Sequence, residues 1–469
     1  MSKLFRKTLG HRGRRRLVWV ITTFLSALIL PTAAASPAGA ASSGDVIVSN
    51  YTDSTMVAPR LITTGPDGAL WFTNILGNSI GRITTSGTVT NYTDASINSP
   101  FAITAGPDGA VWFTNYLGNS IGRISTSGAV TNYTDPSIAT PAGITTGPDG
   151  ALWFTNDGNQ SIGRITAAGV VANYTDPSIS GPVGIAAGPD GALWFTNYGS
   201  NGTVGHSIGR ITTAGTISNY ADGSITAPFA ITAGPDGSLW FTNSNGGSVG
   251  RMTTSGSITN FATEPGLDGQ RGIAVGPDGA LWFADYNGFT GQYGIGRITT
   301  NGTFTNYADP SVFEPDGITA GPDGALWFAD DQLTAGAPNS GSIGRITFAT
   351  PTVVPYGGVV TEGATGTSEL DLTVTLSHPS MQTVTAQWNT VFITGASNVQ
   401  AVPNTDYTPT GGTVTFPPGA TTETVPVTVV NHDLGMPYKL VIASFHNPTN
   451  AGMGGYWGLA FGFLVNNSP

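Results

Sequence analysis

The chain has 469 residues, of which only 10% are charged, and it is rich in glycine (66) and proline (31). This composition favours an all-β protein with many turns, and the length favours two domains. A formal net charge of −11 argues against a nucleic-acid-binding surface, and the lack of cysteine excludes disulfide bonds and thiolate chemistry.

Residues 1–40 are predicted to be a secretory signal peptide. Seven basic residues precede an apolar run from Leu17 to Leu30, and Ala38-Gly39-Ala40 fits a cleavage site before Ala41. The remaining residues comprise ten basic and twenty-eight acidic side chains. We therefore expect a secreted or cell-surface protein that binds no nucleic acid and does not insert into the membrane after cleavage. An uncleaved membrane anchor is the alternative.

A repeat occupies residues 41–350. Its mark is the tetrapeptide GPDG, which occurs seven times at a spacing of 41 to 46 residues, with prolines at Pro66, Pro107, Pro148, Pro189, Pro235, Pro277 and Pro322. This period, together with alternating stretches such as SIGRITT and TVTNYT, predicts a seven-bladed β-propeller with four strands in each blade. The last repeat lacks its outer strand, and Val46 to Asp53 resembles the missing piece. The first strand is therefore expected to complete the last blade and close the ring.

The repeated residues are expected to be scaffold. Each unit carries one tryptophan in L-W-F (V-W-F in the second unit) and one arginine in G-R, which we expect to serve packing and contacts between blades. In GPDG, proline fixes φ, aspartate caps the turn and glycine accepts a positive φ. Chemistry should therefore depend on the positions that differ between the blades.

The motifs GPDG-x-LWFT, N-x-IGRIT and P-x-x-IT together resemble those of the streptogramin B lyases (virginiamycin B lyases), over about residues 45 to 350. The resemblance implies a propeller that opens a cyclic depsipeptide lactone by Mg²⁺-assisted elimination, with histidines as catalytic residues. In this chain, Phe229 and Asp316 stand at the positions that correspond to the family's two key histidines. Glu314 matches an acidic residue of the family, and Asp330 or Asp331 matches another.

These matches define the candidate site. The candidate catalytic residues are Glu314, Asp316 and Asp331, and Mg²⁺ ligands would come from Glu314, Asp316 and Asp330. The alternative explanation is that these acidic residues lie in solvated loops, where the sequence can vary without serving a function. Candidate ligand-binding residues at the P-x-x-I positions are Arg60, Phe101, Phe229 and Arg271, of which the phenylalanines could contact a sugar ring or an apolar side chain. The propeller's one histidine, His206, lies in a glycine-rich insertion.

Residues 351–469 are predicted to form a separate β-sandwich, because the repeat stops and alternating stretches such as ELDLTVTLS follow. The stretches VTEGATGTSELDLTVTLSHPS and DYTPTGGTVTFPPGATTETVPVTVV resemble a Calx-β domain, a family that often binds Ca²⁺. Glu362, Asp406 and Asp433 match its ligand positions, but other acidic positions are lost, including the terminal pair, which here reads Asn466-Asn467. A spacer or adhesion module is the alternative to a calcium-binding one.

Three functions fit these observations. The first is a secreted binding protein for a small cyclic peptide, a glycan or a cell-surface ligand, with no organic cofactor. The second is a Mg²⁺-dependent lyase acting on a streptogramin or another cyclic ester, and the third is a structural cell-surface protein. The lost histidines favour the first, and the intact scaffold with its acidic residues keeps the second open.

Overall fold

The computed structural model describes residues 46–199, 206–262, 269–287, 292–331, 341–394, 399–432, 435–455 and 458–466. These residues form strands and loops without a helix, so no helix among them could cross a membrane. They divide into two compact units, one ending at Ala349 and one beginning at Thr350. The expected all-β class is confirmed, and each unit is described by itself.

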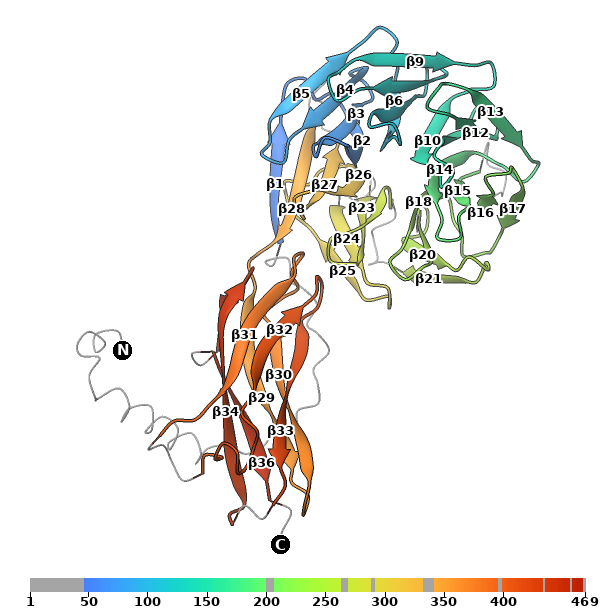
Figure 1. The fold of residues 1–469 in the computed structure, drawn as a ribbon. Helices are drawn as coiled ribbons and strands as arrows, with labels where there is room; N and C mark the ends of the chain where they lie inside the picture. The colour runs from blue at the N-terminus through green and yellow to red at the C-terminus, as the bar shows by residue number, and fades with distance from the viewer. Residues whose placement is uncertain are drawn as a thin grey trace. The chain divides into compact units, whose positions relative to one another are not determined.

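The first unit is a seven-bladed propeller of four-stranded antiparallel sheets (Figure 1). The strands of blades one to three are β2 (Pro59–Thr64), β3 (Leu70–Asn74), β4 (Ser79–Ile83), β5 (Val89–Thr93), β6 (Pro100–Ala105), β7 (Val111–Asn115), β8 (Ser120–Ile124), β9 (Val130–Thr134), β10 (Pro141–Thr146), β11 (Leu152–Asn156), β12 (Ser161–Ile165) and β13 (Val171–Thr175). Those of blades four to six are β14 (Pro182–Ala187), β15 (Leu193–Asn197), β16 (Ser207–Ile211), β17 (Ile217–Tyr220), β18 (Pro228–Ala233), β19 (Leu239–Asn243), β20 (Ser248–Met252), β21 (Ile258–Ala262), β22 (Ile273–Val275), β23 (Leu281–Asn287), β24 (Gln292–Ile298) and β25 (Phe304–Tyr307).

The seventh blade confirms the predicted ring closure. It contains β26 (Pro315–Ala320), β27 (Leu326–Asp330) and β28 (Ser342–Phe348), and its outer strand is β1 (Val46–Thr52) from the start of the chain. β1 pairs with β28 along its whole length, from Val46 opposite Phe348 to Thr52 opposite Ser342. Figure 1 shows β1 beside β28, so β28 is covered and is not the edge strand that it would be in an open array.

The cores between the blades explain the L-W-F motif. In β3, successive side chains point to opposite faces of the sheet, so Trp71 packs into the second blade while Phe72 packs against the seventh. Both side chains are fully buried, as are their equivalents in the other blades. Gly81 of the I-G-R motif makes this possible, because a Cβ there would lie 2.1 Å from the Phe72 ring. The repeated aromatic residues are scaffold, as expected.

We expected the arginine of the repeat to form contacts between blades, but this expectation is wrong. Its ion pair lies within its own blade. Arg82 Nε lies 2.7 Å from Oδ2 of Asp67, and Trp71 Nε1 donates to Oδ1 of the same carboxylate at 3.0 Å. The same ion pair recurs in every blade, at 2.5 to 2.8 Å. Gly68 has φ +72°, as the tight turn requires. The aspartate of GPDG therefore locks the inner hairpin to the third strand.

The second unit contains β29 (Thr352–Thr361), β30 (Thr367–Leu376), β31 (Val384–Val391), β32 (Gly411–Phe416), β33 (Thr422–Val430), β34 (Tyr438–Thr449), β35 (Gly452–Met453) and β36 (Leu459–Val465). Its strands form one hydrogen-bonded path, β32-β31-β34-β36-β29-β30-β33, around one apolar core. β29 joins the two halves, because it pairs with β30 up to a register shift at Pro355–Gly357 and with β36 after it. The expected sandwich is thus a single folded-over, nearly closed sheet.

Candidate functional site

Two sets of side chains lie at one end of the propeller's inner strands. One set follows the proline that opens the first strand in six of the seven blades, with Gln270 in its place in blade six, and the other follows the last residue of each second strand. They come together because these two strands are antiparallel neighbours, so that Pro59 is paired with Asn74. The residue before the proline takes a left-handed conformation, with φ near +50° at Ala58, Ser99 and Ala227, and its carbonyl accepts the N–H that follows the second strand. The geometry repeats from blade to blade while the side chains differ.

The threonine of W-F-T fixes the backbone of the first set. Thr73 Oγ1 donates to the carbonyl of Phe101 in the next blade at 3.0 Å, and it accepts the N–H of Leu61 in its own blade. Corresponding threonines bind the carbonyls of Ala142, Val183, Phe229 and Arg271. In the sixth and seventh blades, alanine replaces the threonine, at Ala284 and Ala329. The scaffold therefore holds five of these site positions by the same hydrogen bond.

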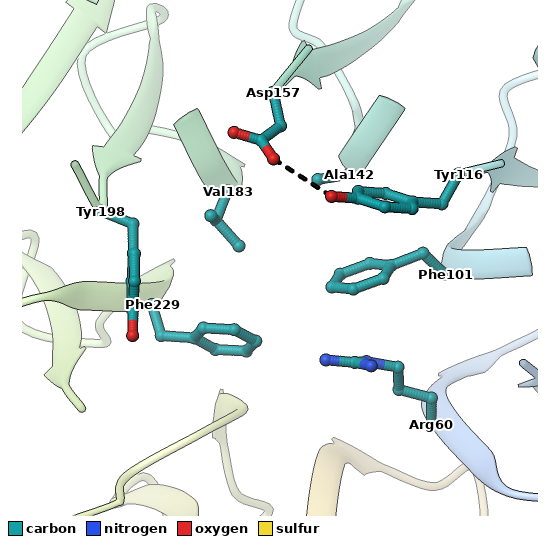
Figure 2. Close-up of a pocket in the computed structure, with 8 residues that line it drawn as sticks. All are labelled: Arg60, Phe101, Tyr116, Ala142, Asp157, Val183, Tyr198 and Phe229. Carbon is teal, nitrogen blue, oxygen red and sulfur yellow. Dashed lines mark hydrogen bonds between the residues drawn. The ribbon is translucent and has the colours of Figure 1, made fainter. Parts of the chain in front are cut away.

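A cavity of about 150 Å³ opens between these side chains. Eight residues line it: Arg60, Phe101, Tyr116, Ala142, Asp157, Val183, Tyr198 and Phe229. Figure 2 shows the Phe101 ring and the Arg60 guanidinium pointing toward the Phe229 ring across one common space, with Val183 above it and Tyr198 beyond Phe229. Four aromatic rings, one cation and one carboxylate thus line the cavity.

The side chains on one wall of this cavity are stacked in a series. The Arg60 guanidinium lies 4.2 Å above the centre of the Phe101 ring, which stacks on Tyr116 with 5.6 Å between ring centres. The Tyr116 hydroxyl donates to Oδ2 of Asp157 at 3.1 Å. Burial, followed by the negative charge of Asp157, raises the pKa of Tyr116 above its usual 10.0. Tyr116 is therefore a neutral donor at physiological pH, and the wall is preorganised.

Asp316 anchors the other end of this series. Its Oδ2 lies 3.1 Å from Nε of Arg60, and its carbonyl accepts the N–H of Gly272 at 2.8 Å. The residue is only 5% exposed, and its second carboxylate oxygen has no hydrogen-bond partner among the described residues. Arg60 is thus held between an anion and an aromatic ring. The structure places three predicted residues, Asp316, Arg60 and Phe101, in direct contact.

Of the other predicted acids of the seventh blade, Glu314 and Asp330 lie in the repeated framework, whereas Asp331 follows the second strand, at the position that Tyr116 has in blade two. Glu314 is buried at the left-handed position before the proline, with φ +58°, and its carbonyl accepts the Asp331 N–H at 3.3 Å. Asp330 is fully buried and accepts the N–H of Phe313 at 3.0 Å, as Asn115 does for Asn98 in blade two. Asp330 thus takes over a structural asparagine's role.

Arg271, the fourth predicted ligand-binding residue, lies beside the cavity rather than in its lining, with its guanidinium 5.2 Å from the centre of the Phe229 ring. Among the described residues, no group of three or more histidine, aspartate or glutamate side chains is placed to hold a metal ion. The expected Mg²⁺ site therefore stays a prediction. In the second unit, Glu362 and Asp406 are both buried, and Asp433 lies outside the described residues.

Five lining residues were missed from the sequence: Tyr116, Ala142, Asp157, Val183 and Tyr198. A signal was available for three of them. The residue after W-F-T-N reads Ile75, Tyr116, Asp157, Tyr198 and Ser244 in successive blades, inside an otherwise constant motif. Such variation at one position of a repeat marks a side chain that the scaffold does not need.

The profile of the "Virginiamycin B lyase family" matches residues 26–222 and 221–428 of this chain. The chain belongs to the virginiamycin B lyase family. A streptogramin B lyase structure is 32% identical, with a TM-score of 0.58, over 65% of this chain and 98% of that one. Virginiamycin B lyase from Staphylococcus aureus is 34% identical, with a TM-score of 0.57, over 65% of this chain and 99% of that one. No curated protein matches the chain.

A third solved structure bears on the chemistry of the virginiamycin B lyase family. It is a catalytically inactive histidine-to-alanine variant of the S. aureus enzyme with quinupristin, 34% identical with a TM-score of 0.56, over 65% of this chain and all of that one. One histidine is thus indispensable in that enzyme. In the propeller of this chain, histidine occurs only at His206, outside the cavity lining, and the positions that resemble the family's histidines hold Phe229 and Asp316.

Proposed function

We propose that this virginiamycin B lyase-family propeller is a secreted binding protein that holds a ring-bearing ligand, such as a cyclic peptide or a glycan, without cleaving it. The observation that carries the proposal is the aromatic cavity, with Phe229 in its wall at a position that resembles one of the family's histidines. A phenyl ring cannot take or give a proton, so this position supplies contact area in place of acid–base chemistry.

The size of the cavity narrows the ligand class. A volume of about 150 Å³ is similar to that of engineered cavities that bind benzene, and it is smaller than pockets that enclose a drug-sized molecule. The cavity therefore fits one ring of a larger ligand, an aromatic side chain or a sugar ring. Arg60, with its guanidinium exposed to the same space, suits a carbonyl or carboxylate next to that ring.

A lyase is the second candidate, favoured by the buried Asp316, whose Oδ1 lacks a hydrogen-bond partner among the described residues. To separate the two functions, the purified protein is incubated with quinupristin and Mg²⁺ and followed by liquid chromatography with mass detection. Elimination would give a new peak of unchanged mass, because no water enters the product. We expect the substrate to remain intact, and turnover would replace the binding proposal by the lyase.

Binding is measured on the same mixture by calorimetry. Tyr198 is 40% exposed, so Tyr198→Ala should leave the fold intact and weaken binding about tenfold or more, as loss of an aromatic contact at a binding site does. Tyr356→Ala, which removes a 66% exposed tyrosine from the other unit, is the control and should bind as the wild type does. An equal effect of both changes would rule out the cavity as the binding site, and absent binding would rule out this ligand.

A further inference from the structure

Four ionisable side chains lie together at one end of the C-terminal unit, remote in sequence from the propeller cavity. They are Glu362, which follows β29, Asp406 between β31 and β32, His432 after β33, and Lys439 in β34. Asp406 is at the centre and is fully buried. A buried carboxylate is costly unless donors and a positive charge surround it, so its contacts show how the cluster is stabilised.

Asp406 receives hydrogen bonds from three groups that carry donors. The Lys439 ammonium lies 2.8 Å from Oδ1 and 2.9 Å from Oδ2, and the Val402 N–H donates to Oδ2 at 2.6 Å. Nε2 of His432 lies 2.8 Å from Oδ1. The ammonium therefore bridges both oxygens of the carboxylate, which is the position that a metal ion takes on a bidentate carboxylate.

Glu362 is a second carboxyl group in the same cluster. It is 1% exposed, and no side chain among the described residues donates to its carboxyl oxygens, although the backbone N–H of His432 lies close enough to lower its pKa. Burial raises the pKa of Glu362 above its usual 4.5, and the nearby charge of Asp406 raises it further, while His432 and Lys439 lower it. The positive charge of Lys439 thus acts on two buried carboxyl groups, Asp406 and Glu362.

We propose that Lys439 is a built-in cation, which occupies the place of a divalent metal ion on Asp406, near Glu362, and makes the C-terminal unit independent of calcium. Lys439 is well suited to this role, because its side chain is only 14% exposed and its strand, β34, pairs with both β31 and β36. It is also the only lysine after Lys7 in the chain.

The resemblance to a Calx-β domain predicts that the C-terminal unit binds Ca²⁺, and the position of Lys439 argues against that prediction. Glu362 and Asp406 carry the oxygens that Ca²⁺ prefers, but Ca²⁺ could reach Asp406 only by displacing an ammonium that already contacts both oxygens. Removing that ammonium takes away the only permanent positive charge at Asp406 and leaves the two buried carboxyl groups with the His432 ring and the Val402 N–H as their neighbours. A Lys439→Met variant should therefore acquire a calcium site that the wild-type protein lacks. This proposal concerns the second unit alone and does not depend on the function of the propeller.

The test is calorimetry of the full chain, with either EDTA or 10 mM CaCl₂, on the wild type, Lys439→Met and Lys439→Arg. The wild-type unfolding temperatures should be the same under both conditions. Lys439→Met should unfold at a lower temperature in EDTA and regain about 5 °C in calcium, if the new site binds with a dissociation constant near 1 mM. Lys439→Arg keeps the charge and should remain insensitive to calcium.

Two further variants test the proposal in case the Lys439→Met protein does not fold. Glu362→Gln should fold and stay insensitive to calcium, because Lys439 still compensates Asp406. In Lys439→Met/Glu362→Gln one carboxylate is removed, and the calcium response should disappear. The proposal is wrong if calcium raises the wild-type unfolding temperature, or if Lys439→Met is as stable as the wild type and does not respond to calcium.

Discussion

At the scale of single residues, the aspartate of GPDG contributes more than a turn cap. Burial tends to raise the pKa of Asp67, but hydrogen bonds from Trp71 and Arg82 outweigh it, and the pKa is lower than its usual 3.8. The same balance lowers the pKa of five further GPDG aspartates: Asp108, Asp149, Asp190, Asp236 and Asp323. One carboxylate thus fixes a tryptophan and an arginine in every blade.

This arrangement predicts how the propeller responds to acid. A carboxylate with a lowered pKa in the folded state contributes stability above its unfolded value of about 3.8, and this contribution is lost as the pH falls through the folded value. Asp67→Asn should lower the free energy of unfolding by about 1 kcal/mol at pH 7. The difference from the wild type should vanish well below pH 3.8, as measured by denaturant unfolding across pH.

The exposed Asp371, in β30 of the second unit, offers a matched control for this change. Asp371→Asn should leave the stability of the propeller unchanged at every pH. An Asp67→Asn protein that stays less stable at pH 2 by the same amount would show that the carboxylate acts through packing and not through its charge.

At the scale of elements, the threonine that ends W-F-T links one blade's second strand to the next blade's first strand. The link is present where Thr155 donates to the Val183 carbonyl at 2.8 Å and accepts the Gly143 N–H at 2.8 Å. In the seventh blade Ala329 stands at this place, and Gly317 corresponds to Gly143. The carbonyl of Arg60 therefore lacks the hydrogen bond that five of its six counterparts receive from threonine.

Ala329→Thr should supply the missing link. The new hydroxyl would donate to the Arg60 carbonyl and accept the Gly317 N–H, with a gain in stability of about 1 kcal/mol. Thr155→Ala removes the same link from blade three and should cost about as much. Thermal unfolding of both variants checks the pair. A destabilised Ala329→Thr beside a destabilised Thr155→Ala would show that the seventh blade has no room for the hydroxyl.

At the scale of the whole molecule, the repeat determines the fold and hides most of the site. Seven copies of GPDG, the tryptophan and the incomplete last unit were enough to predict the blades and the pairing of β1 with β28. The cavity was only partly predicted, since Tyr198 and Asp157 lie after the motif and meet Arg60 only once the ring closes. The arginine pairs were assigned to the wrong partner, because sequence spacing does not show that Arg82 lies beside Asp67.

Ring closure itself can be tested through one tyrosine. Tyr51 of β1 stacks on Trp327 with 5.4 Å between ring centres, as Tyr133 does on Trp112 at 5.3 Å inside the second blade. Tyr51→Ala and Tyr133→Ala remove equivalent contacts, and each should cost about 3 kcal/mol of stability. Their local consequences should differ, because β9 is held in the chain between two blades, whereas β1 is the outermost strand at the start of the propeller and reaches its blade only by closing the ring.

Hydrogen exchange detects that difference. In Tyr51→Ala, the amides of Ile343 to Phe348 in β28 should exchange faster, because β1 can separate from β28 without the rest of the ring unfolding. In Tyr133→Ala, the amides of β8 should exchange only as fast as the lower global stability requires. Equal protection of β28 and β8 in the two variants would mean that β1 is as firmly bound as an internal strand. The propeller would then unfold as one cooperative unit from either position.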